Sequence, residues 1–322
     1  ITIDDNDINI TMCIGAIQCP KSFKNAGSLM RLADHALHLA KAKGPNSYVY
    51  YDVNQYESEF EKNQKINRIK QGLHNQEFIL YYQPKIDLQT KQICGFEALI
   101  RWDHPELGIQ GPFTFIPLVE EHPLIIELGC YVLDCALKQV SIWNKQNIIT
   151  NVSVNLATNQ YQHPDFVFHL VDILNVHDQV SSQQLQLEIL ESGPLKNIQL
   201  CTEIFSQVRK MNIILALDDF GVGHSSLQTL HKLKQDHIKI DKSFVMNMEQ
   251  DQDCKKIVKS IIMLGDAFDM TVIAEGVENT AVWQHLLDMG CEIGQGFGIA
   301  KPMPAHQVPE WIKQWYQSNN MN

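Results

Sequence analysis

Apolar and polar positions follow an alternating rhythm from about residue 66 onward. Short apolar runs of strand length alternate there with longer segments whose apolar residues recur at helical spacing. The predicted strands are Phe78–Gln83, Ile93–Ile100, Thr150–Val154, Leu185–Leu190, Ile213–Leu217, His237–Ile240, Thr271–Ala274 and Glu292–Ile293. The predicted helices are Ile126–Gln146, Asp165–Asn175, Ile198–Met211, Asp253–Phe268, Ala281–Met289 and His306–Gln317. Eight strands with interleaved helices over about 250 residues predict an α/β fold, a TIM-type (β/α)₈ barrel. Periodicity alone leaves a doubly wound open sheet as the alternative.

The front of the chain has a different pattern. Ile8–Ile14 alternates as a strand does, Ala26–Lys43 has helical spacing ended by Gly44 and Pro45, and Tyr48–Tyr51 is a second strand. So few elements are too little for an independent domain. Residues 54–65 are polar and charged and predict a helical linker or the first helix of the next domain. The predicted divisions are a front fragment (1–53), a linker (54–65), a barrel (66–317) and a tail (318–322).

Acidic and amide side chains fall near the C-terminal ends of most predicted strands. They are Glu97, Asn155, Glu188, Glu191, Asp218, Asp219, Asp241, Glu275, Glu278 and Gln295, joined by Lys239. In a barrel these strand ends converge on one mouth. So many carboxylates repel one another without cations, and oxygen ligands without clustered His or Cys suit Mg²⁺ or Mn²⁺. Adjacent acids such as Asp218 and Asp219 can share ligands between two metal ions, and the target is then a phosphodiester.

A simpler interpretation exists for single acids in this set. A carboxylate after a strand often caps the following helix, and for Asp241 and Glu278 both interpretations stay open. Capping does not explain why Asn155, Lys239 and Gln295 belong to the same set.

Composition and charge narrow the range of partners. The 322-residue chain has 26 basic and 37 acidic residues, a net charge of -11. This argues against a groove for a nucleic acid polymer, although a small phosphate ligand fits if metal ions supply positive charge. No apolar run has the length of a membrane span, and no C-x-x-C pair occurs. We therefore expect a cytoplasmic chain without membrane contact. Because it opens with Ile1, we expect a longer protein, which leaves room for an upstream membrane segment.

Eight short motifs occur in an order typical of one family. They are Gln83–Pro84, Glu97–Trp102, Ser153–Leu156, Glu188–Glu191, Asp218–Gly221, Lys239–Asp241, Ala274–Glu278 and Gly294–Phe297. Across roughly residues 66–317 the chain therefore resembles EAL-domain phosphodiesterases. The resemblance implies hydrolysis of cyclic di-GMP to linear pGpG on a modified (β/α)₈ barrel. It also implies two Mg²⁺ or Mn²⁺ ions and a homodimer.

The same resemblance implies roles for individual residues. One metal ion would be held by Glu97, Asn155, Glu188 and Asp218, and the second by Asp219, sharing Asp218. Glu275 would be a ligand of the second metal or the general base, and Lys239 would position the attacking water. Substrate-binding or supporting roles fall to Gln83, Arg101, Glu191, Asp241, Glu278, Gln295 and Pro302. Among these, Arg101 would meet a substrate phosphate and Glu191 would brace the loop after Asp219.

Two positions in that loop depart from the family pattern. Val222 stands where the family usually has Thr, and His224 stands where it usually has Tyr. These departures bear on the catalytic rate and the regulation of the predicted phosphodiesterase more than on the type of reaction. They keep open the alternative of a catalytically weak or inactive receptor for cyclic di-GMP, and a scaffold that binds no dinucleotide is a third possibility.

The front fragment resembles the C-terminal part of a GGDEF domain. The residues that carry this resemblance are Ala33–Leu37, Ala40–Lys41, Gly44–Asn46 and Tyr48. The Gly-Gly-Asp-Glu-Phe sequence is absent, so we predict no cyclase activity for this chain.

Overall fold

A computed structural model describes residues 2–3, 6–7, 10–18, 26–193, 197–223 and 227–319. The chain divides into two compact units, Ile1–Gln71 and Gly72–Asn322. The helix α2 (Val53–His74) contains the boundary between them and includes the residues predicted to be a linker.

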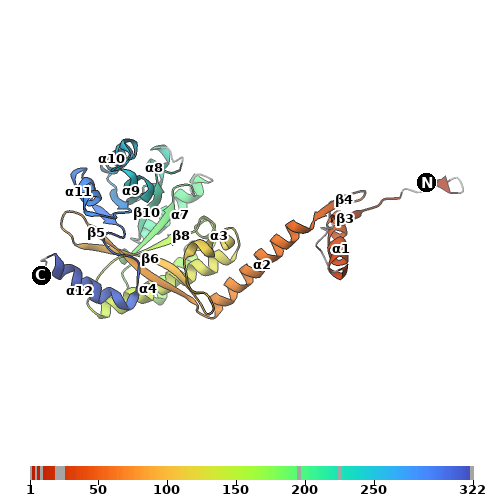
Figure 1. Cartoon of the computed structure of the whole chain (residues 1–322), viewed down its shortest axis with the longest axis horizontal. Coiled ribbons are helices and arrows are strands. Elements are labelled where there is room, and N and C mark those ends of the chain that lie inside the picture. Colours follow the sequence, from red (N-terminus) through yellow and green to blue (C-terminus); the bar gives the residue numbers. More distant parts are fainter. Residues whose placement is uncertain are drawn as a thin grey trace. The chain divides into compact units, whose positions relative to one another are not determined.

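The second unit is built on a closed barrel of eight strands (Figure 1). In spatial order they are β5 (Phe78–Asp87), β6 (Ile93–His104), β8 (Val152–Leu156), β9 (Leu185–Leu190), β10 (Ile214–Phe220), β11 (His237–Ile240), β12 (Thr271–Glu275) and β13 (Ile293–Gln295). Strand β5 pairs with both β6 and β13, so the sheet has no open edge between its first and last strands. The predicted barrel is confirmed, and the open sheet is excluded.

One strand gives the barrel its modified form. Strand β5 runs antiparallel to both neighbours, whereas the pairs from β6 round to β13 are parallel. Its register places Gln83 beside Glu97, while Asn155 lies beside Glu188 in the parallel part. Two short strands extend the sheet: β7 (Gly108–Gln110) pairs with β6, and β14 (Met303–Pro304) pairs with β5. This hairpin extension explains why β6 continues to His104, four residues beyond its predicted end.

Helices cover the outside of the barrel. They are α3 (Ile116–Val119), α4 (Leu124–Lys145), α5 (Thr158–Tyr161), α6 (Phe166–Val176), α7 (Ile198–Lys210), α8 (Leu227–Leu233), α9 (Lys242–Asn247), α10 (Gln252–Ala267), α11 (Thr280–Asp288) and α12 (Val308–Ser318), with 3₁₀ turns η1 (Pro112–Thr114), η2 (Ser182–Gln184) and η4 (Ala305–Gln307). The six predicted helices are present, with ends within two residues of the prediction. Each long helix buries an apolar stripe against the sheet, as α4 does with Leu133, Leu137 and Trp143. Among the described residues, no helix combines the length and apolar character needed to cross a membrane.

The first unit contains a parallel strand pair joined by a helix. Strand β3 (Ile14–Gln18) pairs with β4 (Tyr48–Asp52), and α1 (Ala26–Lys43) lies between them in sequence; β1 (Thr2–Ile3) and β2 (Asn6–Asp7) form a separate pair. Helix α1 packs closely on β3, because a Cβ atom at Gly15 would lie 2.2 Å from the backbone nitrogen of Leu37. The assignment of this unit to a GGDEF fragment stays a prediction.

The predicted first strand of this unit is misplaced. Residues 10–13 are described and form no strand, and residues 8 and 9 lie outside the described part of the chain. The strand begins only at Ile14, where Gly15 permits the close approach to α1. The alternation of apolar and polar residues at 8–14 therefore placed the strand too early in the chain. The segment that packs against α1 through Gly15 is the strand instead.

Candidate active site

A buried lysine lies at the centre of the acidic residues. Lys239 on β11 has no exposed surface. Its Nζ atom lies 2.6 Å from Glu188 Oε2, 2.7 Å from Glu275 Oε1, 3.1 Å from Asp218 Oδ1 and 3.5 Å from Glu97 Oε2. Burial alone would lower the pKa of Lys239, but these four carboxylates raise it well above the usual value. The lysine is therefore a permanent ammonium ion around which four other strands each direct one acid.

One ammonium ion does not compensate four carboxylates. Burial, together with repulsion from Asp218 and Glu97, raises the pKa of Glu275 to about 8. Burial also raises the pKa values of Glu97 and Asp218, with Glu188 adding repulsion to each. At Glu188 burial acts in the same direction, but Lys239 and Lys85 outweigh it and bring the pKa down to about 2. Such a cluster is electrostatically suited to further cations.

Three carboxylates are close enough to hold a metal ion. Asp218, Asp219 and Glu275 each offer an oxygen atom, and these atoms lie within 4.8 Å of one another. Oxygen-only donors of this kind suit a hard divalent cation. The donor set therefore fits the metal ions that the sequence predicts.

A local irregularity brings two consecutive acids to the same site. Neighbouring side chains of a regular strand point to opposite faces. The register of β10 against β11 shifts between Leu217 and Phe220, and Asp219 has a left-handed backbone with φ 53°. Aspartate tolerates that conformation better than most residues. Because the strand is irregular here, Asp219 can join Asp218 at the metal-binding cluster.

Amide side chains fix the orientation of Glu97. Asn155 Nδ2 donates to Glu97 Oε1 at 2.6 Å, and Gln295 Nε2 donates to Glu97 Oε2 at 2.7 Å. Gln295 also donates to Gln83 Oε1 at 3.1 Å, and Gln83 Nε2 donates to the carbonyl of Ala300 at 2.9 Å. The buried Oε1 atom of Gln295 has no hydrogen-bond partner among the described residues, which leaves an acceptor for a ligand or water.

The loop after Asp219 is attached to Glu191. Glu191 is buried, and its Oε2 atom accepts hydrogen bonds from the backbone nitrogens of Gly221 at 3.0 Å and Gly223 at 2.9 Å. A Cβ atom at Gly223 would lie 2.8 Å from the Glu191 carboxyl carbon, so a larger residue there would displace the Glu191 carboxylate. Val222 is exposed between the two glycines, and His224 lies outside the described residues.

The remaining predicted residues lie around this cluster. A cavity of about 480 Å³ is lined by Gln83, Glu97, Asp218, Glu275 and Gln295 together with Arg101, Glu278 and Pro302. Asp241 acts as the N-cap of α9, since its Oδ1 atom accepts from Ser243 N at 2.9 Å, and it also faces Asp219. Glu278 is not a cap, because Asn279 caps α11. The capping interpretation thus describes Asp241 but not Glu278.

Lys85 is a buried member of the cluster that sequence reasoning missed. Its Nζ atom lies 3.4 Å from Glu188 Oε1 and 3.2 Å from Gln186 Oε1, and it also donates to Ser153. Glu188 therefore lies between Lys239 and Lys85, although burial lowers the pKa of Lys85. The available signal was a lysine inside a predominantly apolar stretch, but the strand was predicted to end at Gln83.

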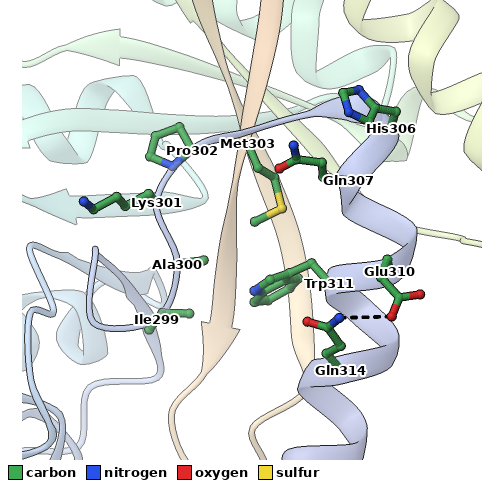
Figure 2. A pocket seen from close by; sticks show the side chains of 10 residues that line it. All are labelled: Ile299, Ala300, Lys301, Pro302, Met303, His306, Gln307, Glu310, Trp311 and Gln314. Carbon is green, nitrogen blue, oxygen red and sulfur yellow. Dashed lines mark hydrogen bonds between the residues drawn. The ribbon is translucent and has the colours of Figure 1, made fainter.

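A second cavity lies beyond one wall of the first. It has a volume of about 620 Å³ and is bordered by residues 299–303 and α12, where Trp311 points toward Ala300 and Ile299 (Figure 2). Pro302 lines both cavities, and the carbonyl of Ala300 is the acceptor for Gln83. The two cavities therefore share Pro302, and Ala300 beside it in the chain is connected by hydrogen bonds through Gln83 and Gln295 to Glu97.

Comparisons with known proteins agree on one family. The family model for the EAL domain matches residues 66–302. The bifunctional diguanylate cyclase/cyclic di-GMP phosphodiesterase MucR of Pseudomonas aeruginosa is 33% identical over 307 residues, which are 95% of this chain and 45% of MucR. Cyclic di-GMP phosphodiesterase PdeR of Escherichia coli is 30% identical over 306 residues, 95% of this chain and 46% of PdeR. The chain thus spans less than half the length of these relatives.

Solved structures give the same result. The PaMucR phosphodiesterase in complex with c-di-GMP has a TM-score of 0.73 and 35% identity, covering 76% of this chain and 99% of that chain. The EAL enzyme Bd1971 with cAMP and cyclic di-GMP bound has a TM-score of 0.76 and 30% identity, covering 90% of this chain and 77% of that chain.

Proposed function

Because the chain belongs to the EAL domain family, we propose that it is a metal-dependent phosphodiesterase that hydrolyses cyclic di-GMP to linear pGpG. The observation that carries this proposal is the set of four carboxylates around Lys239, with Asp218, Asp219 and Glu275 spaced to share a cation. Relatives named as cyclic di-GMP phosphodiesterases support the choice of substrate.

The metal-binding residues in this proposal follow from the family pattern. Glu97, Asn155, Glu188 and Asp218 would hold one Mg²⁺ or Mn²⁺ ion, and Asp218 and Asp219 would hold the other. Glu275 would be a further ligand of this second ion or the general base. Two bound ions would neutralise phosphodiester charge and lower the pKa of a water molecule that acts as nucleophile.

The chain's own residues position the reactants. The Lys239 ammonium, 2.7 Å from Glu275 Oε1, is a compact charge that can hold a water or phosphoryl oxygen in place. If Glu275 is not a metal ligand, it would accept a proton as general base. Arg101 borders the cavity and presents a planar guanidinium that matches a phosphate group. The implied homodimer stays a prediction.

Turnover should depend on divalent metal ions. Purified protein incubated with cyclic di-GMP and Mg²⁺ or Mn²⁺ should yield pGpG. Excess EDTA should stop product formation, because without cations the carboxylates repel the negatively charged phosphodiester. Chromatographic product analysis measures both, and adding Mn²⁺ beyond the EDTA should restore turnover. Product formation that is unaffected by EDTA would contradict the proposal.

The receptor alternative predicts a different result in the same assay. A receptor would bind cyclic di-GMP and return it intact with either metal ion. Exposed Val222 in the loop after Asp219 is the observation in its favour, whereas the assembled carboxylate cluster favours the enzyme. Measurable binding with unchanged substrate would establish the receptor.

Glu191→Ala should weaken metal binding without unfolding the barrel. The substitution removes the carboxylate that accepts from two loop amides, and a hydrogen bond to a charged group contributes at most about 1.5–3 kcal/mol. Asp219 then loses its fixed position, so we expect the metal concentration for half-maximal turnover to rise about tenfold. Glu191→Gln keeps an acceptor oxygen and should recover part of the loss. Equal metal dependence in wild type and Glu191→Ala would show that this attachment is not needed.

A further inference from the structure

Phe113 is unusually exposed for an aromatic residue. Its side chain is 85% exposed, more than any other large apolar side chain in the described part of the chain. A single exposed apolar residue often has no role. Phe113 differs because it lines the 480 Å³ cavity together with Arg101, Glu97 and Asp218.

The turn that carries Phe113 is held firmly in place. Phe113 is the middle residue of η1, where Pro112 restricts φ and Thr114 bonds to the carbonyl of Gly111 through its hydroxyl group at 2.7 Å. The next residue, Phe115, is fully buried, with ring centroids 5.2 Å from Phe78 and 5.8 Å from Trp102. Phe115 thus fills the buried position two residues after Phe113, while Phe113 itself is exposed and lines the cavity.

A second aromatic ring borders the same cavity. Phe297 is 55% exposed and follows β13, while η1 follows the hairpin of β6 and β7. Strands β13 and β6 flank β5 in the barrel. A Cβ atom at Gly296 would lie 2.2 Å from the backbone nitrogen of Val277, so the backbone at Phe297 is tightly packed. Two aromatic rings thus stand at a cavity whose wall also carries the carboxylates Glu97, Asp218 and Glu275.

We propose that Phe113 contacts the substrate by stacking on one of the two purine bases of the cyclic dinucleotide. The inference rests on the proposed function and adds a residue that determines substrate binding. With a phosphodiester at the carboxylates, the attached bases extend along the cavity walls. Every purine has a flat π face, and a phenyl ring with only two rotatable bonds stacks on it at low entropic cost.

Steady-state kinetics of three variants test this contact. Phe113→Ala should raise KM for cyclic di-GMP about tenfold, within the range for one stacked base, while kcat changes less than twofold. Phe113→Trp should keep KM near the wild-type value because it retains a flat aromatic face. Leu107→Ala is the matched control, since Leu107 is 67% exposed near η1 but does not line the cavity. Its KM should equal the wild-type value.

Fluorescence gives a readout that does not depend on turnover. A cyclic dinucleotide carrying 2-aminopurine is mixed with Phe113→Trp in a stopped-flow instrument and followed before the first turnover. Stacking on the indole should quench the analogue more strongly than wild type does, and Leu107→Trp should add no quenching.

The outcomes separate this inference from the proposed function. If the wild type hydrolyses cyclic di-GMP but Phe113→Ala has an unchanged KM, the stacking contact is refuted while the phosphodiesterase stands. If the wild type neither binds nor hydrolyses the dinucleotide, the proposed function fails. If Phe113→Ala and Leu107→Ala both lower the mass measured by light scattering, these two exposed side chains serve a protein interface and the stacking inference is overturned.

Discussion

Glu97→Ala is expected to abolish phosphodiester hydrolysis. Glu97 is buried, and its two carboxylate oxygens are held by Asn155 and Gln295, with Lys239 3.5 Å away. The substitution removes a predicted metal ligand and the acceptor for Asn155, and leaves Gln295 with Gln83 as its acceptor. We expect kcat to fall at least about 10²–10³-fold, the range seen when one preorganised electrostatic group is lost from an active site. Product formation from cyclic di-GMP under saturating Mn²⁺ measures the loss.

Two companion variants identify the cause of that loss. Glu97→Gln retains the shape of the side chain but removes its charge and replaces one of its two acceptor oxygens with a donor, so it should be nearly as inactive as Glu97→Ala. Glu127→Ala removes an exposed carboxylate from the first turn of α4 and should retain wild-type turnover. Wild-type activity in Glu97→Ala would refute the assignment of the metal site.

Lys239→Met is expected to lower the melting temperature in EDTA more than other lysine substitutions. The four carboxylates that surround Lys239 would lose their buried counter-ion. Removing one partner of a buried ion pair typically costs about 3–5 kcal/mol. For a unit of this size that corresponds to roughly 6–20 °C. Calorimetry or circular dichroism measures the shift.

Metal ions should partly reverse this destabilisation. Bound Mn²⁺ supplies the positive charge that methionine lacks, so the gain in melting temperature from EDTA to Mn²⁺ should be larger in Lys239→Met than in wild type. Lys138→Met replaces an exposed lysine on α4 and should melt like wild type in both conditions. If Lys239→Met melts at the wild-type temperature in EDTA, Lys239 is not the counter-ion of the cluster.

The barrel was largely predictable because its parallel strands are short apolar runs between clear helical patterns. The prediction failed where tertiary pairing decides the ends. Strand β5 continues through Pro84 to Asp87, since it is paired with β6 on one side and β13 on the other. In the front unit, Gly15 and its packing on α1 determined where the strand begins, which alternation of residue types does not reveal.

The composition of the site was predictable in part, because strand ends converge in any parallel barrel. The contacts between the site residues were not predictable. The irregularity in β10 brings Asp219 beside Asp218, although a regular strand would separate them. Lys85 reaches Glu188 from the antiparallel strand, where the rule about C-terminal strand ends gives no guidance. A cap and a site residue look the same in sequence, as Asp241 illustrates.

Closure of the barrel by β5 also constrains how the protein folds while it is being synthesised. Glu97 receives its hydrogen bond from Gln295, 198 positions later in the chain, and β5 completes its pairing only with β13. Contacts so distant in sequence form late, after the intervening loops have been ordered. On the ribosome, β5 must keep one edge unpaired until β13 has emerged. Such edges attract other chains, so nascent protein is exposed to aggregation during this interval. Chaperone dependence should therefore be greatest for chains that end before residue 293.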